Sequence, residues 1–124
     1  MLIPKPLSFI NDLHNRPIKM VQIASKIDLK KLRQSADGAC KLMKVLSNRN
    51  RLMLLCEISQ GEKCVSELEE NLGIFQPTLS QQLTILRTQK LVKTRREGKQ
   101  IYYSLASPIA ISVMALLYQH YCKK

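Results

Sequence analysis

Apolar residues recur at helical spacing from Asp28 onward, which places the start of the folded domain there. In the first helical segment they share one face, and they are Leu29, Leu32, Ala36, Ala39, Cys40, Met43 and Leu46. Asp28 is a suitable N-cap for this helix, and Asn48 caps a second helix over residues 49–59. Residues 1–27 show no such period and hold three of the five prolines. We therefore expect a loose arm over residues 1–27 and one domain over residues 28–124.

Two shorter helical segments follow, with the spacing of a helix-turn-helix. The first covers about residues 65–72 and ends at Gly73, and the second begins near Gln76-Pro77 and runs to about Gln89. Proline is tolerated in a first helical turn because its missing N–H would have no partner within the helix. The linker Gly73-Ile-Phe75 is short enough for a tight turn. The pattern predicts a DNA-binding unit whose second helix lies in the major groove.

From Leu91 onward the period changes from helical to β. Residues 91–96 and 100–105 are rich in β-branched and aromatic residues, and Glu97-Gly-Lys99 between them predicts a hairpin turn. Ser107-Pro108 is typical of the start of a last helix, which runs to about Tyr121. This helix is apolar on nearly all sides, so we expect it to pack against a second subunit. The predicted fold is mainly α with a small β-hairpin, in the order α-α-α-α-β-β-α, and homodimeric.

The charge of the chain is strongly positive and unevenly distributed. The 124 residues carry a net charge of +11, and six cations against one anion lie between Arg87 and Lys99. Residues 57–70, in contrast, hold five glutamates and one lysine. A local basic region of this kind predicts a nucleic-acid partner. No apolar run is long enough to span a bilayer, and prolines interrupt the N-terminal segment, so we expect a cytoplasmic protein without a membrane partner.

The second helix of the helix-turn-helix carries side chains suited to DNA, and no acidic residue occurs between Ile74 and Arg96. Glutamine can pair bidentately with adenine, hydroxyls can meet bases or phosphates, and arginine can reach guanine or phosphate. The exposed positions that we expect to contact DNA on this helix are Gln76, Thr78, Ser80, Gln81, Gln82, Thr84 and Arg87. On the hairpin, the expected contacts are Arg95, Arg96 and Lys99.

Four segments together resemble the ArsR family of winged helix-turn-helix repressors. They are Leu46-Ser-Asn-Arg-Asn-Arg-Leu-Met-Leu-Leu55, Val65-Ser-Glu-Leu68, Gln76-Pro-Thr-Leu-Ser-Gln-Gln-Leu83 and Gly98-Lys-Gln-Ile-Tyr-Tyr-Ser-Leu105. The resemblance covers about residues 30–122. It implies a dimer packed through the first and last helices, with the hairpin as a wing on the DNA backbone or minor groove. Phe75 replaces the small hydroxyl residue that usually caps the DNA-reading helix in this family.

The resemblance also bears on what releases the protein from DNA. Two metal patterns of the family are absent, since Cys64-Val-Ser66 lacks the second thiol of Cys-x-Cys and the last helix has no carboxylate. Cys56 and Cys122 resemble instead, in position and separation, the dithiol of the persulfide-sensing branch, that of the BigR-, SqrR- and HlyU-like repressors. Spacing alone favours two inert thiols. The resemblance implies that the pair reacts with persulfide or polysulfide, releasing the operator of sulfide-detoxification genes.

Other functions fit the sequence less well than this hypothesis. A metal-responsive repressor of the same fold would need an unforeseen ligand set, such as Cys40, Cys64, Cys122 and His120. A thiol oxidoreductase would need a Cys-x-x-Cys motif, and the chain has none; nor does it have a catalytic triad or a phosphate-binding loop. A non-specific nucleic-acid binder would not need the glutamine-rich helix. We expect no enzyme activity, cofactor or metal. Cys40 falls on the apolar face of the first helix, where we expect it in the core or at an interface, and Cys64 is expected to be a bystander near the start of the third helix.

Overall fold

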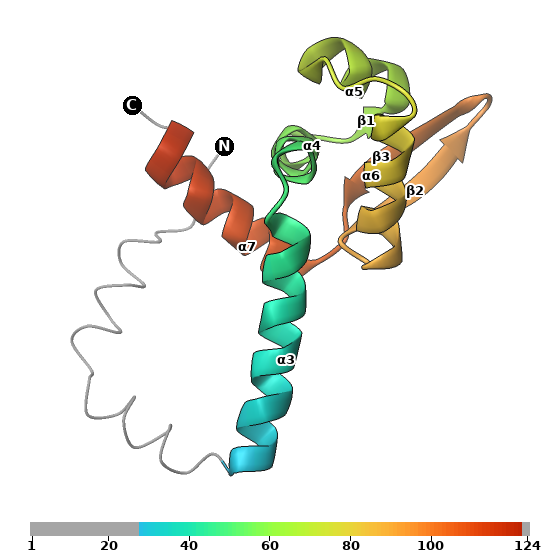
Figure 1. The fold of residues 1–124 in the computed structure, drawn as a ribbon. Coiled ribbons are helices and arrows are strands. Elements are labelled where there is room, and N and C mark those ends of the chain that lie inside the picture. The colour runs from blue at the N-terminus through green and yellow to red at the C-terminus, as the bar shows by residue number, and fades with distance from the viewer. Residues whose placement is uncertain (1–27, 123–124) are drawn as a thin grey trace. The chain divides into compact units, whose positions relative to one another are not determined.

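The computed structural model describes residues 28–122 (Figure 1). The chain divides into two compact units between Met43 and Lys44, inside helix α3 (Leu29–Leu46), and each unit is described by itself. The arm predicted over residues 1–27 lies outside the described residues, as do residues 123–124 of the predicted domain.

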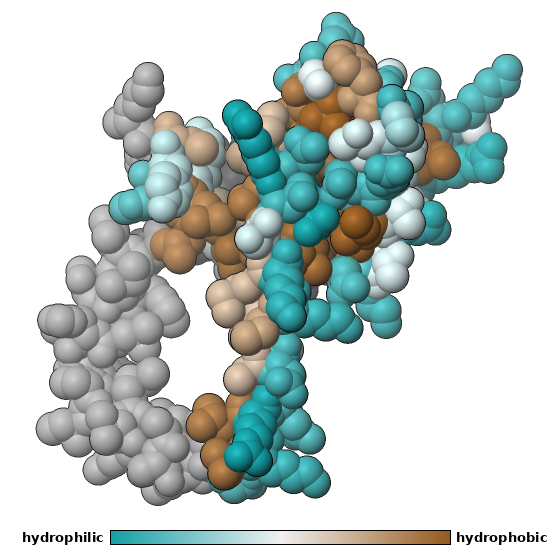
Figure 2. Space-filling view, in the orientation of Figure 1, coloured by the Kyte–Doolittle hydropathy of each residue, from teal (hydrophilic) through white to brown (hydrophobic). Residues whose placement is uncertain are grey.

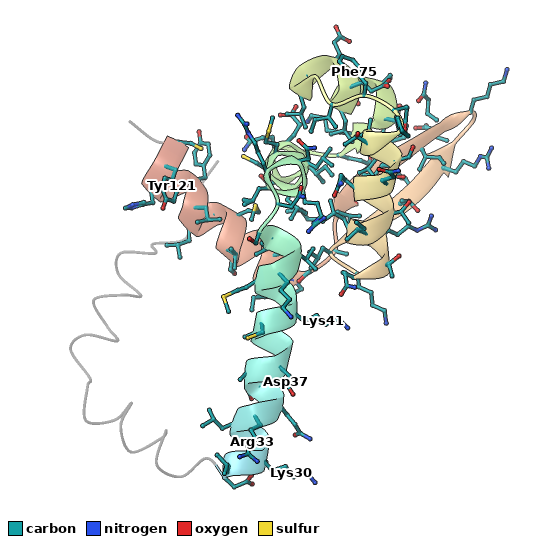
Figure 3. The ribbon with its side chains drawn as sticks, in the orientation of Figure 1. Lys30, Arg33, Asp37, Lys41, Phe75 and Tyr121 are labelled. Carbon is teal, nitrogen blue, oxygen red and sulfur yellow. The ribbon has the colours of Figure 1, made fainter. Side chains whose placement is uncertain are left out.

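In the first unit, residues 28–43 contribute most of α3, whose predicted start is confirmed. The backbone N–H of Lys31 donates to Asp28 Oδ1 at 2.9 Å. The apolar face of this part of the helix is open, with Leu29 and Met43 exposed by 59% and 58%. Charged side chains, including those of Lys30, Arg33, Asp37 and Lys41, point away from α3 in Figure 3. Cys40 is exposed as well, so its assignment to a core within the chain is wrong, and the alternative assignment to an interface between subunits stays a prediction.

In the second unit, α4 (Arg49–Ser59) contacts the three α-helices that follow it and also the sheet. Asn48 caps α4 as predicted, since its side chain accepts from the N–H of Arg51 at 3.1 Å. Helices α5 (Val65–Leu72) and α6 (Thr78–Thr88) form the predicted helix-turn-helix, and Gly73 ends α5 in the left-handed conformation at φ 67°. The largest fully buried side chains join the three helices, and they are Leu54, Leu55, Leu68, Leu79 and Leu86.

Helix α6 begins two residues later than the sequence indicates. Pro77 occupies the N-cap position instead of the first turn, and α6 starts at Thr78. The Gln76 side chain supplies the cap that Phe75 cannot, because its Oε1 accepts from the backbone N–H of Ser80 at 3.1 Å and also from the Ser80 hydroxyl. A glutamine one residue before the N-cap therefore replaces the small hydroxyl residue of the family pattern.

The hairpin is confirmed, and it belongs to a sheet of three strands in the order β1-β3-β2. Strands β2 (Val92–Glu97) and β3 (Gln100–Leu105) pair antiparallel, and Gly98 at φ 62° makes the turn between them. Strand β1 (Lys63–Cys64) was not predicted, since two residues show no period. It pairs with Tyr102 and Tyr103 of β3 and leads directly into α5. The wing is thereby joined to the helix-turn-helix by backbone hydrogen bonds.

The last helix, α7 (Pro108–Leu117), begins as predicted, with Ser107 Oγ accepting from the N–H of Ala110 at 3.2 Å. Its continuation is a π-helical turn, η1 (Tyr118–Cys122), where the sequence predicts a single helix to about Tyr121. Apolar side chains of α7 and η1 remain exposed, and they include Ile109, Ile111, Leu116, Tyr118 and Tyr121. Figure 2 shows this apolar surface over α7 and a largely hydrophilic surface over the wing. No helix in the described part of the chain is long and apolar enough to cross a membrane.

Candidate DNA-binding surface and cysteine pair

The outer face of α6 presents polar side chains, as the sequence predicts. Gln81, Thr84 and Arg87 are exposed, and Leu79, Leu83 and Leu86 are buried on the opposite face. The Thr84 hydroxyl donates to the carbonyl oxygen of Ser80 at 2.8 Å, which leaves its oxygen lone pairs free to accept. This face offers amide, hydroxyl and guanidinium groups suited to base edges and phosphates.

Two of the predicted contact residues are not exposed. Thr78 and Gln82 are half-buried at the edges of the polar face. Gln82 is turned toward α4, because its Oε1 accepts a hydrogen bond from Arg51 Nη1 at 2.9 Å. The sequence does not predict the role of Arg51, since α4 has two arginines in its first turn and no pattern distinguishes Arg51 from Arg49.

The three wing cations predicted to contact DNA lie in different surroundings. Arg95 bonds both carboxylate oxygens of Glu62 at 2.8–2.9 Å and contacts Glu97 at 3.0 Å. Its guanidinium also lies 4.6 Å from the centre of the Tyr102 ring. Hydrogen bonds to Glu62 and then Glu97 raise the pKa of Arg95, so its charge is fixed but compensated. Arg96 and Lys99 are exposed without a carboxylate partner among the described residues, and they carry more of the net positive field of the wing.

The two cysteines predicted to form the sensor both lie in the second unit. Cys56 lies half-buried on α4, and Cys122 is exposed at the end of η1. Burial raises the pKa of the Cys56 thiol most, and negative charge at Cys122 and at Glu57 raises it further. Charge at Cys122 can act on Cys56 in this way only over a short distance. All four cysteines are free thiols in the structure.

Cys64 is the buried N-cap residue of α5, with its N–H donating to Glu67 Oε1 at 2.9 Å. Its sulfur lies 3.2 Å from the hydroxyl of Ser66, the residue that stands where Cys-x-Cys would have its second thiol. Among residues 28–122, no three His, Cys, Asp or Glu side chains are grouped so that they could hold a metal ion. The surroundings of Cys64 are thus those of a structural residue at a helix start.

Comparison with known proteins agrees with this geometry. Residues 48–94 match the family model described as "Bacterial regulatory protein, arsR family". The biofilm growth-associated repressor of Agrobacterium fabrum is 43% identical over 106 residues, which cover 86% of this chain and 91% of that protein. The chain belongs to the arsR family of bacterial regulatory proteins.

Solved structures of arsR-family regulators share the fold. The transcriptional repressor BigR from Xylella fastidiosa superposes with a TM-score of 0.70 and 43% identity, covering 77% of this chain and 94% of that one. Reduced HlyU from Vibrio cholerae gives a TM-score of 0.74 and 35% identity, covering 77% of this chain and all of the other. A homodimeric winged helix-turn-helix domain from Mycobacterium bovis gives 0.63 and 30% identity, covering 77% of this chain and 86% of that one.

As an arsR-family member, the chain is a DNA-binding transcriptional repressor similar to BigR, with a winged helix-turn-helix fold. The proteins that it matches are transcriptional regulators, and no enzyme family is among the findings above. In the terms of this fold, α6 is the DNA-reading helix and the β2–β3 hairpin is the wing.

Proposed function

We propose that this arsR-family repressor binds its operator as a homodimer and leaves it when Cys56 and Cys122 react with a persulfide. The observation that carries the proposal is the effect of charge at Cys122, in the turn after α7, which raises the pKa of the Cys56 thiol on α4. The similarity to BigR and to HlyU, whose structure is described as reduced, supports a thiol-based signal. A nearby pair of reduced cysteines can be bridged without unfolding the domain.

The dimer is supported by apolar surfaces that each of the two units leaves uncovered. Leu29, Leu32 and Met43 are exposed on α3, and Ile109 and Ile111 on α7. Exposed apolar surface of this extent marks an interaction site, and a second copy of the chain offers the matching surface. A two-fold dimer would present two α6 helices to successive major grooves, about 34–36 Å apart.

The surroundings of the two thiols suggest an order of reaction. Cys122 is exposed, whereas Cys56 is half-buried with a raised pKa, so Cys122 is the first nucleophile. The Cys122 thiolate attacks the outer sulfur of the persulfide RSSH, the thiol RSH leaves, and a protein persulfide forms. Cys56 then attacks the Cys122 sulfur and expels H₂S, which leaves a disulfide between the two residues. Each further RSSH that contributes its outer sulfur lengthens the bridge by one sulfur and releases one RSH.

The bridge would release DNA by fixing α4 relative to the C-terminal turn. Helix α4 packs on α5 and α6, and η1 continues α7, which is part of the expected dimer surface. A shift between these elements alters the separation of the two DNA-reading helices, and operator affinity depends on that separation.

The test is fluorescence anisotropy of the gene's own upstream DNA with reduced protein, repeated after glutathione persulfide and after glutathione disulfide. We expect persulfide to release the wild type, while Cys56→Ser and Cys122→Ser stay bound. Cys40→Ser is the matched control, because it removes an exposed thiol outside the pair. Release of Cys56→Ser to the same extent as the wild type would refute the dithiol mechanism. Release by stoichiometric Zn²⁺ instead of persulfide would favour the metal-responsive alternative.

A further inference from the structure

The side chain of Arg51 connects three elements of the second unit. From the first turn of α4, its Nε donates to the carbonyl oxygen of Val45 at 2.6 Å, and Nη2 reaches that of Lys44 at 3.4 Å. These carbonyls belong to the last turn of α3, where no further residue of the helix can satisfy them. Nη1 donates to Gln82 Oε1 of α6 at 2.9 Å. We call this set of hydrogen bonds the arginine link.

The ion pairs in the described part of the chain involve Arg95 and not Arg51. The charge of Arg51 is balanced instead by the negative end of the α3 dipole, which favours a cation at this place. A guanidinium is planar and rigid, so its position relative to α3 and α4 also determines where Gln82 is held. The backbone of Arg51 is fixed in turn by the Asn48 cap.

The bond to Arg51 also determines the orientation of the Gln82 amide. A guanidinium only donates hydrogen bonds, so the amide oxygen of Gln82 must face it. The Gln82 NH₂ group then faces away from Arg51, and Oε1 keeps one lone pair for a further donor. The bond to Arg51 therefore restricts the orientations in which Gln82 could form the two-way pair with adenine.

We infer that Arg51 is a positioning residue for DNA binding, which sets the place of α6 by holding Gln82 against α4 and the end of α3. Arg51 itself does not need to touch DNA for this role. Because Cys56 lies on the same helix as Arg51, the link also carries a displacement of α4 to the DNA-reading helix. Only this last step depends on the proposed function.

The inference is tested by a double-mutant cycle on operator affinity. Arg51→Lys keeps the charge but loses the rigid fork, and Gln82→Leu removes the acceptor without adding a charge. We expect each variant to raise the Kd by about 3- to 30-fold and the double variant to be no weaker than the weaker single variant. Gln81→Leu is the matched control, since Gln81 is exposed on α6 and has no bond to Arg51. The fold-change in Kd caused by Gln81→Leu should multiply with the fold-change caused by Arg51→Lys.

A second measurement separates positioning from simple loss of fold. In NMR spectra of the free protein, the side-chain N–H signals of Arg51 should shift in Gln82→Leu and stay in place in Gln81→Leu. The ratio of the Kd after persulfide to the Kd before it should fall toward one in Arg51→Lys and remain unchanged in the exposed-site variant Arg49→Lys. If the effects of Arg51→Lys and Gln82→Leu multiply, the link does not position α6. If persulfide fails to release the wild type, the proposed function fails, while the affinity cycle still decides the role of Arg51.

Discussion

Replacing Asn48 by alanine tests whether the cap of α4 stabilises the helix that carries both Arg51 and Cys56. The substitution removes the oxygen that accepts from the N–H of Arg51 at 3.1 Å. Residue 48 already has extended backbone angles, φ −145° and ψ 126°, which alanine adopts without strain. The loss is therefore that of the cap alone, and Asn48 is half-buried, so water replaces the missing bond only in part.

Losses of this kind cost about 0.5–2 kcal/mol, and we expect about 1 kcal/mol here. In a domain of this size, that lowers the Tm by about 4–8 °C. Urea unfolding should show a lower midpoint with an unchanged m-value. The protein concentration is kept fixed, since the stability of the proposed dimer would depend on it.

Asn48→Asp is the matched control. It keeps the acceptor and places a negative charge at the positive end of the helix dipole, so it should be at least as stable as the wild type. The reasoning is refuted if Asn48→Ala unfolds at the wild-type midpoint, or if Asn48→Asp loses as much stability as Asn48→Ala.

Two further predictions concern the cysteine pair and the wing. Cys122→Ser should lower the pKa of Cys56, because charge at residue 122 helps to raise it. Glu57→Gln should lower the same pKa by less. The pH profile of Cys56 alkylation, followed by mass spectrometry, measures both shifts. Since the pKa of Cys56 is raised on folding, its contribution to stability is present below the pKa of the unfolded thiol and is lost as the pH rises through the folded pKa. An unshifted alkylation profile in Cys122→Ser would contradict the proximity of the pair. Glu62→Gln should free part of the charge of Arg95 and tighten DNA binding most at low salt. Anisotropy titrations at several salt concentrations measure this effect. If the affinities of Glu62→Gln equal those of the wild type at every salt concentration, Arg95 is not part of the DNA-binding surface.

The helices and the hairpin were predictable because each carries a local signal. Asn48 and Ser107 are strong caps, Gly73 ends a helix, and Gly98 marks a turn, so the boundaries of α4 and α5 and the start of α7 match the structure. The family resemblance directed attention to Cys56 and Cys122, where spacing alone favoured inert thiols.

What the sequence could not provide depends on contacts between distant residues. Strand β1 has only two residues and exists because β3 pairs with it. Gln82 looks like an exposed residue on a helical pattern, and only the position of Arg51 on α4 shows that its amide is engaged. The same holds for Arg95, whose partner Glu62 lies in the loop before β1. The hydrophobic period therefore predicts the exposure and the partners of side chains least well at the edge of a polar face.

The pairing of β1 with β3 determines which segment can be exchanged between relatives to make hybrid regulators. A graft of the hairpin alone, residues 92–105, would bring in a foreign β3 beside the resident Lys63–Cys64, and Cys64 is also the first residue of the α5 cap. The smallest segment that can be exchanged is therefore residues 63–105, which contains the wing, the helix-turn-helix and the strand β1 that pairs with the wing.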